Sequence, residues 1–227
     1  MQYSNIYPAK FLSRPNRFIA EIETGGETCL CHVKNTGRCR ELLLPGADIY
    51  VQKAENKSRK TKYDLISVYK GERLINMDSQ IPNAVFREWA EAGGFLSGIE
   101  EIRSEKTYKN SRFDFYLETS REKIFAEVKG VTLEEDGAVF FPDAPTERGV
   151  KHVLELCDCV ENGYAAYLIF VIQMQGAAFF APNRKTHPAF ADALTAAAQR
   201  GVRILAVDCR VTKDSIIARK RVPVRLY

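Results

Sequence analysis

The chain has 227 residues, of which 45% are hydrophobic and 27% charged, as in an ordinary soluble globular protein of one or two domains. No apolar run approaches the roughly 18 residues that a membrane-spanning helix needs, and the N-terminal segment MQYSNIYPAKFL lacks the basic region and apolar core of a secretory signal. We therefore expect a cytoplasmic protein with no membrane partner.

The net charge of +4 is unevenly distributed along the chain. Residues 1–80 contain 13 Lys and Arg against 9 Asp and Glu, whereas residues 81–227 contain 20 of each. An excess confined to the first third of the chain is a mild indication of a polyanionic partner.

Residues 1–79 are predicted to form a domain of short strands separated by turns. Alternating segments are interrupted by Gly25-Gly26, Asn35-Thr36-Gly37, Pro45-Gly46 and Gly71. The strands expected are 16–23, 27–33, 47–51, 63–69 and 73–77. Five or six short strands in so short a segment indicate a small β-barrel of the OB type.

Two basic features of this domain are candidate nucleic-acid contacts. The loop 53–62, KAENKSRKTK, carries Lys57, Arg59 and Lys60 and could follow a phosphate backbone. Arg38 follows the Asn35-Thr36-Gly37 turn, whose amides could bind an anion together with its guanidinium. A solvated hairpin tip and a simple turn are the alternative interpretations.

Six cysteines occur without a C-x-x-C pair, so we expect reduced thiols. A thiol metal site is disfavoured because the usual zinc spacing is missing. The cysteines are Cys29, Cys31, Cys39, Cys157, Cys159 and Cys209.

Residues 80–227 are predicted to form a second domain of mixed helices and strands. The segment from Asn83 to Ala92 has one apolar face and ends at Gly93-Gly94, which predicts a helix. A strand is expected over 99–108, where Glu105 is a candidate acid.

The next stretch, residues 110–130, carries the strongest chemical signal. Apolar and polar residues alternate over 112–118 and again over 123–130, as in two half-buried strands. If the chain folds back about Ser120 and Arg121, paired residue numbers sum to 241 and Asp114 lies opposite Glu127. This register is an assumption, because Ser-Arg is not a favoured hairpin turn.

Such a hairpin would place Asp114, Glu127 and Lys129 on one face. Two carboxylates can bind a hard cation such as Mg²⁺ or Mn²⁺, which activates a bound water and polarises a phosphoryl oxygen. A nearby ammonium can neutralise developing negative charge. The alternative is an exposed strand with an ordinary alternation of charges.

A helix is expected to begin near Pro145-Thr146-Glu147, where Pro and Thr suit a first turn. Its basic residues Arg148, Lys151 and His152 would suit phosphate, and a solvated face is the alternative. The expected buried residues are Val150, Val153, Leu154, Cys157 and Val160.

The remaining elements are a buried strand over 164–174, an Ala-rich helix over 188–199, a buried strand over 202–208 and a basic edge strand within 216–227. The second domain therefore has the order helix, three strands, helix, strand, helix, strand.

This order, with Asp114 on the second strand and Glu127-Val128-Lys129 on the third, resembles the core of PD-(D/E)xK nucleases. More closely, the chain resembles the sugar fermentation stimulation protein A family over nearly its whole length. The most specific matching segment is Phe141-Pro-Asp-Ala-Pro-Thr-Glu-Arg-Gly149 with Lys151-His152. Shorter matches are Asn35-Thr-Gly37, Ser104-Glu105, Ser111-Arg-Phe-Asp-Phe115 and Glu127-Val-Lys-Gly-Val-Thr-Leu133.

The resemblance implies an α/β (α+β) protein with an OB-fold domain, predicted here as 1–79, and a restriction-endonuclease-like mixed sheet flanked by helices, predicted as 80–227. It implies DNA binding with little sequence preference and a regulatory role in sugar metabolism, maltose in particular. Asp114 and Glu127 become metal ligands, with the Val128 carbonyl, and Glu105 is a candidate third acid. Lys129 would orient water, while Arg148, Lys151 and His152 would line the site.

Three functions follow as hypotheses: a Mg²⁺-dependent nuclease, a non-catalytic DNA-binding regulator, and a binder of RNA or a nucleotide through the barrel. The assembly considered is a homodimer.

Overall fold

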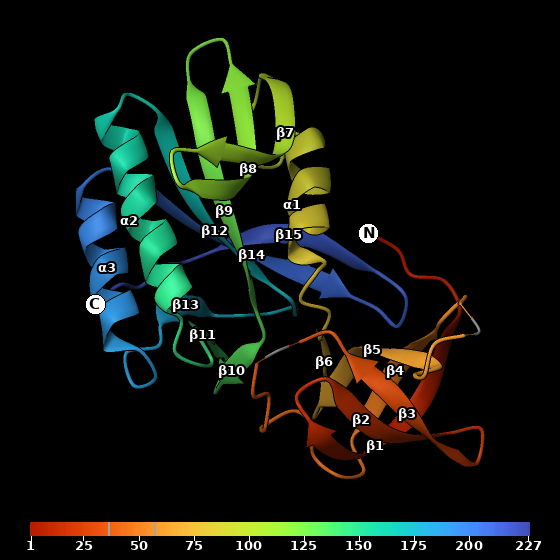
Figure 1. Ribbon diagram of the computed structural model, residues 1–227. Coiled ribbons are helices and arrows are strands. Elements are labelled where there is room, and N and C mark those ends of the chain that lie inside the picture. Colours follow the sequence, from red (N-terminus) through yellow and green to blue (C-terminus); the bar gives the residue numbers. More distant parts are fainter. Residues whose placement is uncertain (36, 57) are drawn as a thin grey trace.

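The N-terminal part of the computed structural model is a closed barrel. The structure describes residues 1–35, 37–56 and 58–227. The barrel and the hairpin that extends it contain β1 (Ile6–Asn16), β2 (Ile19–Thr24), β3 (Glu27–Val33), β4 (Asp48–Lys53), β5 (Tyr63–Lys70) and β6 (Arg73–Asn76). The strand order β3-β2-β1-β4-β5 is closed by parallel pairing of β3 with β5, and β6 extends β5 (Figure 1).

The five strands expected from the sequence are all present, and the OB-like barrel is confirmed. The additional strand is β1, which pairs with both β2 and β4. Pro8 and Pro15 lie within it and obscure the strand pattern, because proline cannot donate to a ladder. The barrel interior is filled by fully buried apolar side chains that include Ile22, Val51 and Leu65.

The C-terminal part is a mixed six-stranded sheet with the order β15-β14-β12-β9-β8-β7. The strands β9, β12 and β14 run parallel, while the neighbours on both sides are antiparallel. The bounds are α1 (Pro82–Glu91), β7 (Ile99–Tyr108), β8 (Ser111–Thr119), β9 (Lys123–Val131), α2 (Glu147–Glu161), β12 (Ala165–Ile172), α3 (Pro188–Gln199), β14 (Arg203–Val211) and β15 (Ile216–Val222). A small separate sheet contains β10 (Leu133–Glu135), β11 (Ala138–Phe141) and β13 (Phe179–Pro182).

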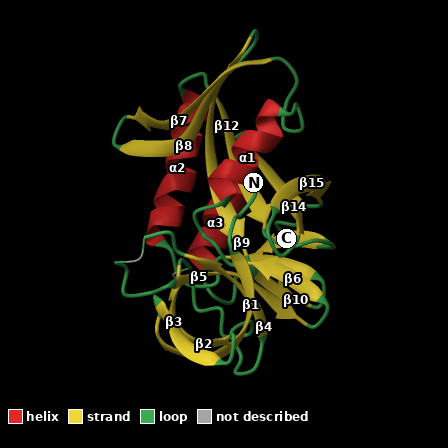
Figure 2. Ribbon diagram, turned by 90° about the vertical axis from the view of Figure 1, so that its right-hand side faces the viewer, coloured by secondary structure: helices red, strands yellow, loops and turns green. Residues whose placement is uncertain are grey.

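The helices cover opposite faces of the large sheet. α1 lies on one face, and α2 and α3 lie side by side on the other (Figures 1 and 2). The run Ala166–Ile172 in β12 is buried between these layers, which explains why it is apolar at every position. The predicted order of the main elements and the basic edge strand at β15 are confirmed.

The buried face of α2 differs from the prediction. Thr146 caps the helix, with its side chain accepting a hydrogen bond from the Gly149 amide, as its position in the sequence predicts. However, Leu154 is 49% exposed, whereas His152 is only 5% exposed. The helix is rotated so that a polar ring faces the sheet, and a polar group is buried there because it finds partners.

A buried polar network connects the barrel to the large sheet. The Gln173 amide, after β12, donates to the Asn76 carbonyl and side chain and to the Asp78 carbonyl at 3.0–3.1 Å. Gly130 is needed where β9 passes this network, because a Cβ there would lie 2.4 Å from Gln173 Oε1. The connector Ser79–Ile81 follows directly and leads into α1.

Within the three described segments, no helix is long and apolar enough to cross a membrane. All six cysteines, which belong to these segments, are free thiols.

Candidate active site

The β8–β9 hairpin has the register that was assumed for a chain folding back about Ser120 and Arg121. Its paired residues, from Phe115 with Ala126 to Glu118 with Lys123, have numbers that sum to 241. Asp114 lies at the end of this ladder, next to the β9 backbone at Val128, whose amide donates to Asp114 Oδ2 at 2.8 Å. The hairpin therefore brings the two predicted acids to one place.

Asp114 is fixed from two elements. Besides the Val128 amide on Oδ2, the Asn83 side chain at the start of α1 donates to Oδ1 at 2.9 Å. Burial and the neighbouring charge of Glu127 raise the pKa of Asp114, although these hydrogen bonds act in the opposite direction. A carboxylate in this position is electrostatically costly unless a cation joins the site.

Glu127 is only 2% exposed, and its two oxygens have different surroundings. Oε1 is bound by Lys129 Nζ at 2.5 Å and by His152 Nδ1. Oε2 is buried and has no hydrogen-bond partner among the residues that the structure describes. Burial favours a higher pKa for Glu127, but the hydrogen bond from His152 and the charge of Lys129 outweigh it and lower the pKa.

The imidazole of His152 is oriented by Arg148 one helical turn earlier. Arg148 Nε lies 3.4 Å from His152 Nε2. A guanidinium N–H can only donate, so Nε2 is the acceptor and the imidazole proton is on Nδ1. This tautomer donates to Glu127 Oε1, and the arrangement leaves Oε2 as the bare oxygen.

These groups line a cavity of about 330 Å³ where the connector, the starts of α1 and α2, and the middle of β8 and β9 converge. Sequence reasoning did not assign Gln80, Asn83 or Thr146, which also line it. Asn83 was the first residue of the predicted helix, yet only the fold shows that it faces Asp114. The other lining residues are Ser79, Asp114, Glu127, Val128, Lys129, Phe141, Arg148, Gly149 and His152.

The residues present fit a hard divalent cation. A buried, unpartnered carboxylate oxygen is costly, and it adjoins a cavity that a second carboxylate lines. Within residues 1–35, 37–56 and 58–227 no group of three or more His, Cys, Asp and Glu side chains is arranged to hold a metal. A site with two carboxylates suits Mg²⁺, because this ion is usually bound by one or two carboxylates and keeps several water ligands.

Two predicted residues lie outside this cavity. Glu105 is an exposed residue of β7 with φ of 57°, and its carboxylate lies 3.4 Å from Arg112 Nη1. Lys151 projects from the exposed side of α2 and lies 3.7 Å from Glu155. The structure does not bring the candidate third acid or Lys151 to the other site residues.

None of the described basic residues predicted as nucleic-acid contacts in the barrel lines the candidate active site. Arg59 is bound to Asp64 at 2.6 and 3.1 Å, so its guanidinium already has a carboxylate partner. Lys60 and Arg38 are exposed. The prediction for Lys57 lies outside the described residues.

Gly37 lies against the second domain. Gly37 donates to the Asn35 side chain at 2.8 Å, and a Cβ on Gly37 would lie 2.0 Å from Asp143 Oδ2. Gly37 therefore forms an interdomain contact, and its lack of a side chain permits the close approach to Asp143.

Comparison with known proteins agrees with this architecture. Residues 80–215 match the model of the sugar fermentation stimulation protein RE domain, and residues 12–77 match that of the SfsA N-terminal OB domain. The chain belongs to the SfsA family.

SfsA relatives match over their full length. Sugar fermentation stimulation protein homologues of Desulfitobacterium hafniense (strain DSM 10664 / DCB-2) and Ruminiclostridium cellulolyticum are 61% and 58% identical over 226 residues, covering 100% of this chain and 99% and 100% of the relatives. The solved structure of Pyrococcus furiosus SfsA in complex with Ca²⁺ is similar with a TM-score of 0.89 and 28% identity, covering 99% of this chain and 98% of that one.

Proposed function

We propose that the protein is a Mg²⁺-dependent phosphodiesterase that acts on DNA. The observation that carries the proposal is the bare Oε2 of buried Glu127, in a cavity that Asp114, Lys129 and Arg148 also line. Two carboxylates beside two cationic side chains suit a metal and a phosphodiester together.

Asp114 and Glu127 would hold the cation, with the Val128 carbonyl as the further ligand that the family resemblance implies. When bound, Mg²⁺ or Mn²⁺ supplies a polarised phosphoryl oxygen and a water of lowered pKa. The complex of the Pyrococcus furiosus relative with Ca²⁺ supports this, since Ca²⁺ also prefers oxygen ligands.

The other side chains have separate tasks in this proposal. Lys129 provides a positive charge to the water or the phosphate. Arg148 is exposed at the start of α2, from where its guanidinium can bind a phosphate oxygen. His152 is buried on Glu127, so its task is to orient that carboxylate, in place of the nucleic-acid contact expected from the sequence.

DNA is the proposed substrate because the OB domain and the basic first third of the chain suit a polyanion. The biological setting proposed is the regulation of sugar metabolism, maltose in particular, as the family resemblance implies.

A DNA-binding regulator without turnover is the second candidate. The observation that favours it is the pair of donors, Lys129 and His152, on one oxygen of Glu127. Because Glu127 already neutralises the Lys129 ammonium, these side chains need no substrate to be stable. In this reading their interactions serve only to stabilise the fold.

The test is cleavage of labelled single- and double-stranded DNA by purified protein with Mg²⁺ or Mn²⁺. Asp114→Asn and Glu127→Gln should abolish cleavage, whereas Glu105→Gln, a matched change on the neighbouring strand, should retain it. Binding without cleavage of any DNA under either metal would contradict the phosphodiesterase and support the regulator.

A further inference from the structure

His187 is a buried histidine that the proposed function does not use. It is 7% exposed and is the N-cap residue of α3, although its side chain makes no capping hydrogen bond to that helix. The imidazole faces the start of α2, one wall of the candidate active site. A buried polar ring needs hydrogen-bond partners, and both of its nitrogens find them there.

The imidazole of His187 holds the start of α2 through two contacts. The Thr146 backbone amide donates to Nδ1 over 3.3 Å, and Nε2 lies 3.2 Å from Glu147 Oε1. A backbone N–H can only donate, so Nδ1 is unprotonated and the neutral ring carries its proton on Nε2. The Glu147 side chain is 89% exposed, so its bond contributes little. The contact that fixes the helix is therefore the one from Nδ1 to the backbone.

The turn before α3 also holds the segment that leads into α2. Asn183 donates from its backbone amide to the Phe141 carbonyl at 2.8 Å and from its side chain to the Pro142 carbonyl at 3.0 Å. Asn183 thus anchors one end of this segment, and His187 anchors the other. Both ends, Phe141 and Thr146, line the candidate active site.

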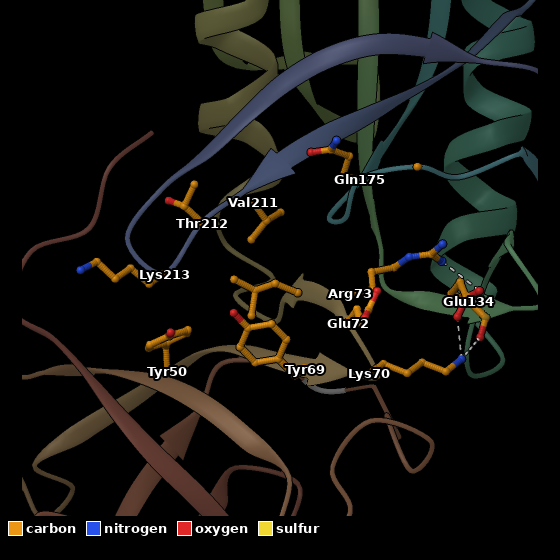
Figure 3. A pocket seen from close by; sticks show the side chains of 13 residues that line it. Tyr50, Tyr69, Lys70, Glu72, Arg73, Glu134, Gln175, Val211, Thr212 and Lys213 are labelled. Carbon is orange, nitrogen blue, oxygen red and sulfur yellow. Dashed lines mark hydrogen bonds and ion pairs between the residues drawn. The ribbon is translucent and has the colours of Figure 1, made fainter.

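The side chain that depends on this anchor is Arg148, two residues after the helix cap. In the interdomain cavity of about 1060 Å³ shown in Figure 3, the neighbouring cations are ion-paired with Glu134. By contrast, no ion pair joins Arg148 to a carboxylate in the part of the chain that the structure describes, and its guanidinium contacts His152 at 3.4 Å. The position of this guanidinium in the cavity is therefore determined by the first turn of α2.

We infer that His187 is a positioning residue for the proposed reaction, which holds the start of α2 so that the Arg148 guanidinium meets a phosphate of the substrate. His187 does not line the cavity itself and acts through the backbone of Thr146. The inference rests on the proposed function, because its substrate is the same DNA phosphodiester.

The experiment compares two substitutions of His187 in cleavage of DNA by the full-length protein with Mg²⁺. An asparagine amide oxygen occupies the position of Nδ1, whereas a glutamine amide reaches that of Nε2. His187→Gln should raise KM by about 2- to 12-fold, the range that corresponds to one lost neutral hydrogen bond. Its kcat should stay within about twofold, because the weakened contact is one of substrate binding. His187→Asn retains the acceptor and should keep both constants within about twofold of the wild type.

Arg148→Gln tests the route of the effect. In this background His187→Gln should raise KM no further, because the side chain that it positions is gone. His32→Gln, a matched change on β3 of the barrel, should leave KM unchanged. A lower kcat at unchanged KM in His187→Gln would indicate a loss of folded protein and would overturn the positioning role. Equal KM values in His187→Asn and His187→Gln would overturn it as well.

The tautomer of His187 provides a test that needs neither a variant nor cleavage. Long-range proton–nitrogen NMR spectra of the wild type should show an unprotonated Nδ1 and a protonated Nε2. A protonated Nδ1 would overturn the contact with Thr146. A wild type that cleaves no DNA would overturn the proposed function and, with it, this role of His187, whereas the other contrary results would overturn the role of His187 alone.

Discussion

The bare oxygen of Glu127 can be tested through the imidazole that holds its other oxygen. His152 donates from Nδ1 to Glu127 Oε1, while Arg148 Nε lies 3.4 Å from Nε2. An asparagine amide reaches the position of Nδ1, whereas a glutamine amide reaches that of Nε2. His152→Asn therefore preserves the donor to Glu127, and His152→Gln removes it.

Loss of a hydrogen bond that orients a metal ligand weakens metal binding by about 10- to 100-fold. Lys129 still binds Glu127 Oε1 at 2.5 Å when the imidazole is lost. We therefore expect His152→Gln to fall in the lower half of that range, about 10- to 30-fold or about 1.4 to 2 kcal/mol. His152→Asn should remain within about threefold of the wild type because the donor to the ligand is kept.

The assay is Mn²⁺ titration without DNA, followed by the electron paramagnetic resonance signal of the free ion. Glu127→Gln provides the reference for loss of the ligand, and thermal unfolding verifies that each variant is folded. Equal Mn²⁺ affinity in His152→Asn and His152→Gln would refute the reasoning, since the position of the donor would then have no effect.

Three further predictions concern stability. Burial and the neighbouring carboxylate of Glu127 raise the pKa of Asp114. Protonated Asp114 therefore stabilises the fold in acid, and this contribution is lost as the pH rises above the ordinary value of 3.8 and through the raised folded-state pKa. Asp114→Asn should raise the melting temperature of the metal-free protein at neutral pH, and a melting temperature below that of the wild type would contradict this. Burial alone would raise the pKa of Glu134, but the bond from Lys70 outweighs it and lowers the pKa, so the stabilisation is present at neutral pH and is lost as the pH falls through the lowered folded-state value. Glu134→Gln should lower the free energy of unfolding in urea by about 1.5–3 kcal/mol at neutral pH and by less in acid. A loss that does not depend on pH would argue against the ion pairs of Glu134 with Lys70 and Arg73. Gly37→Ala should cost about 1–3 kcal/mol because its Cβ would lie 2.0 Å from Asp143 Oδ2, and a double-mutant cycle with Asp143→Ala should show that the two changes are not additive.

The hairpin of the site could be predicted because its evidence is local. Alternation over β8 and β9 determines which side chains share a face. The register itself had to be assumed, and the observed strand pairing confirms it. The position of Asn83 could not be predicted in this way. Its partner, Asp114, is 31 residues away, and only packing of α1 on the sheet brings them together.

His152 shows why helical periodicity predicts the wrong buried face for α2. A histidine among Arg148 and Lys151 has the pattern of a solvated basic surface, and Leu154 has that of a buried residue. The structure buries the histidine because its partner is a glutamate on β9, which helical periodicity does not include. Local patterns therefore describe propensity, while buried polar contacts depend on the whole fold.

The connector Ser79–Ile81 joins the two domains, yet Ser79 and Gln80 also form part of the wall of the candidate active site. Asp78, just before it, is tied to the large sheet through Gln173. A gene fragment that begins after the connector would encode Asp114 and Glu127 but not Ser79 and Gln80, which complete the wall of their cavity. We therefore expect the two halves of the chain to be inherited and recombined together, since exchanging either one for an unrelated domain would require the site to be rebuilt.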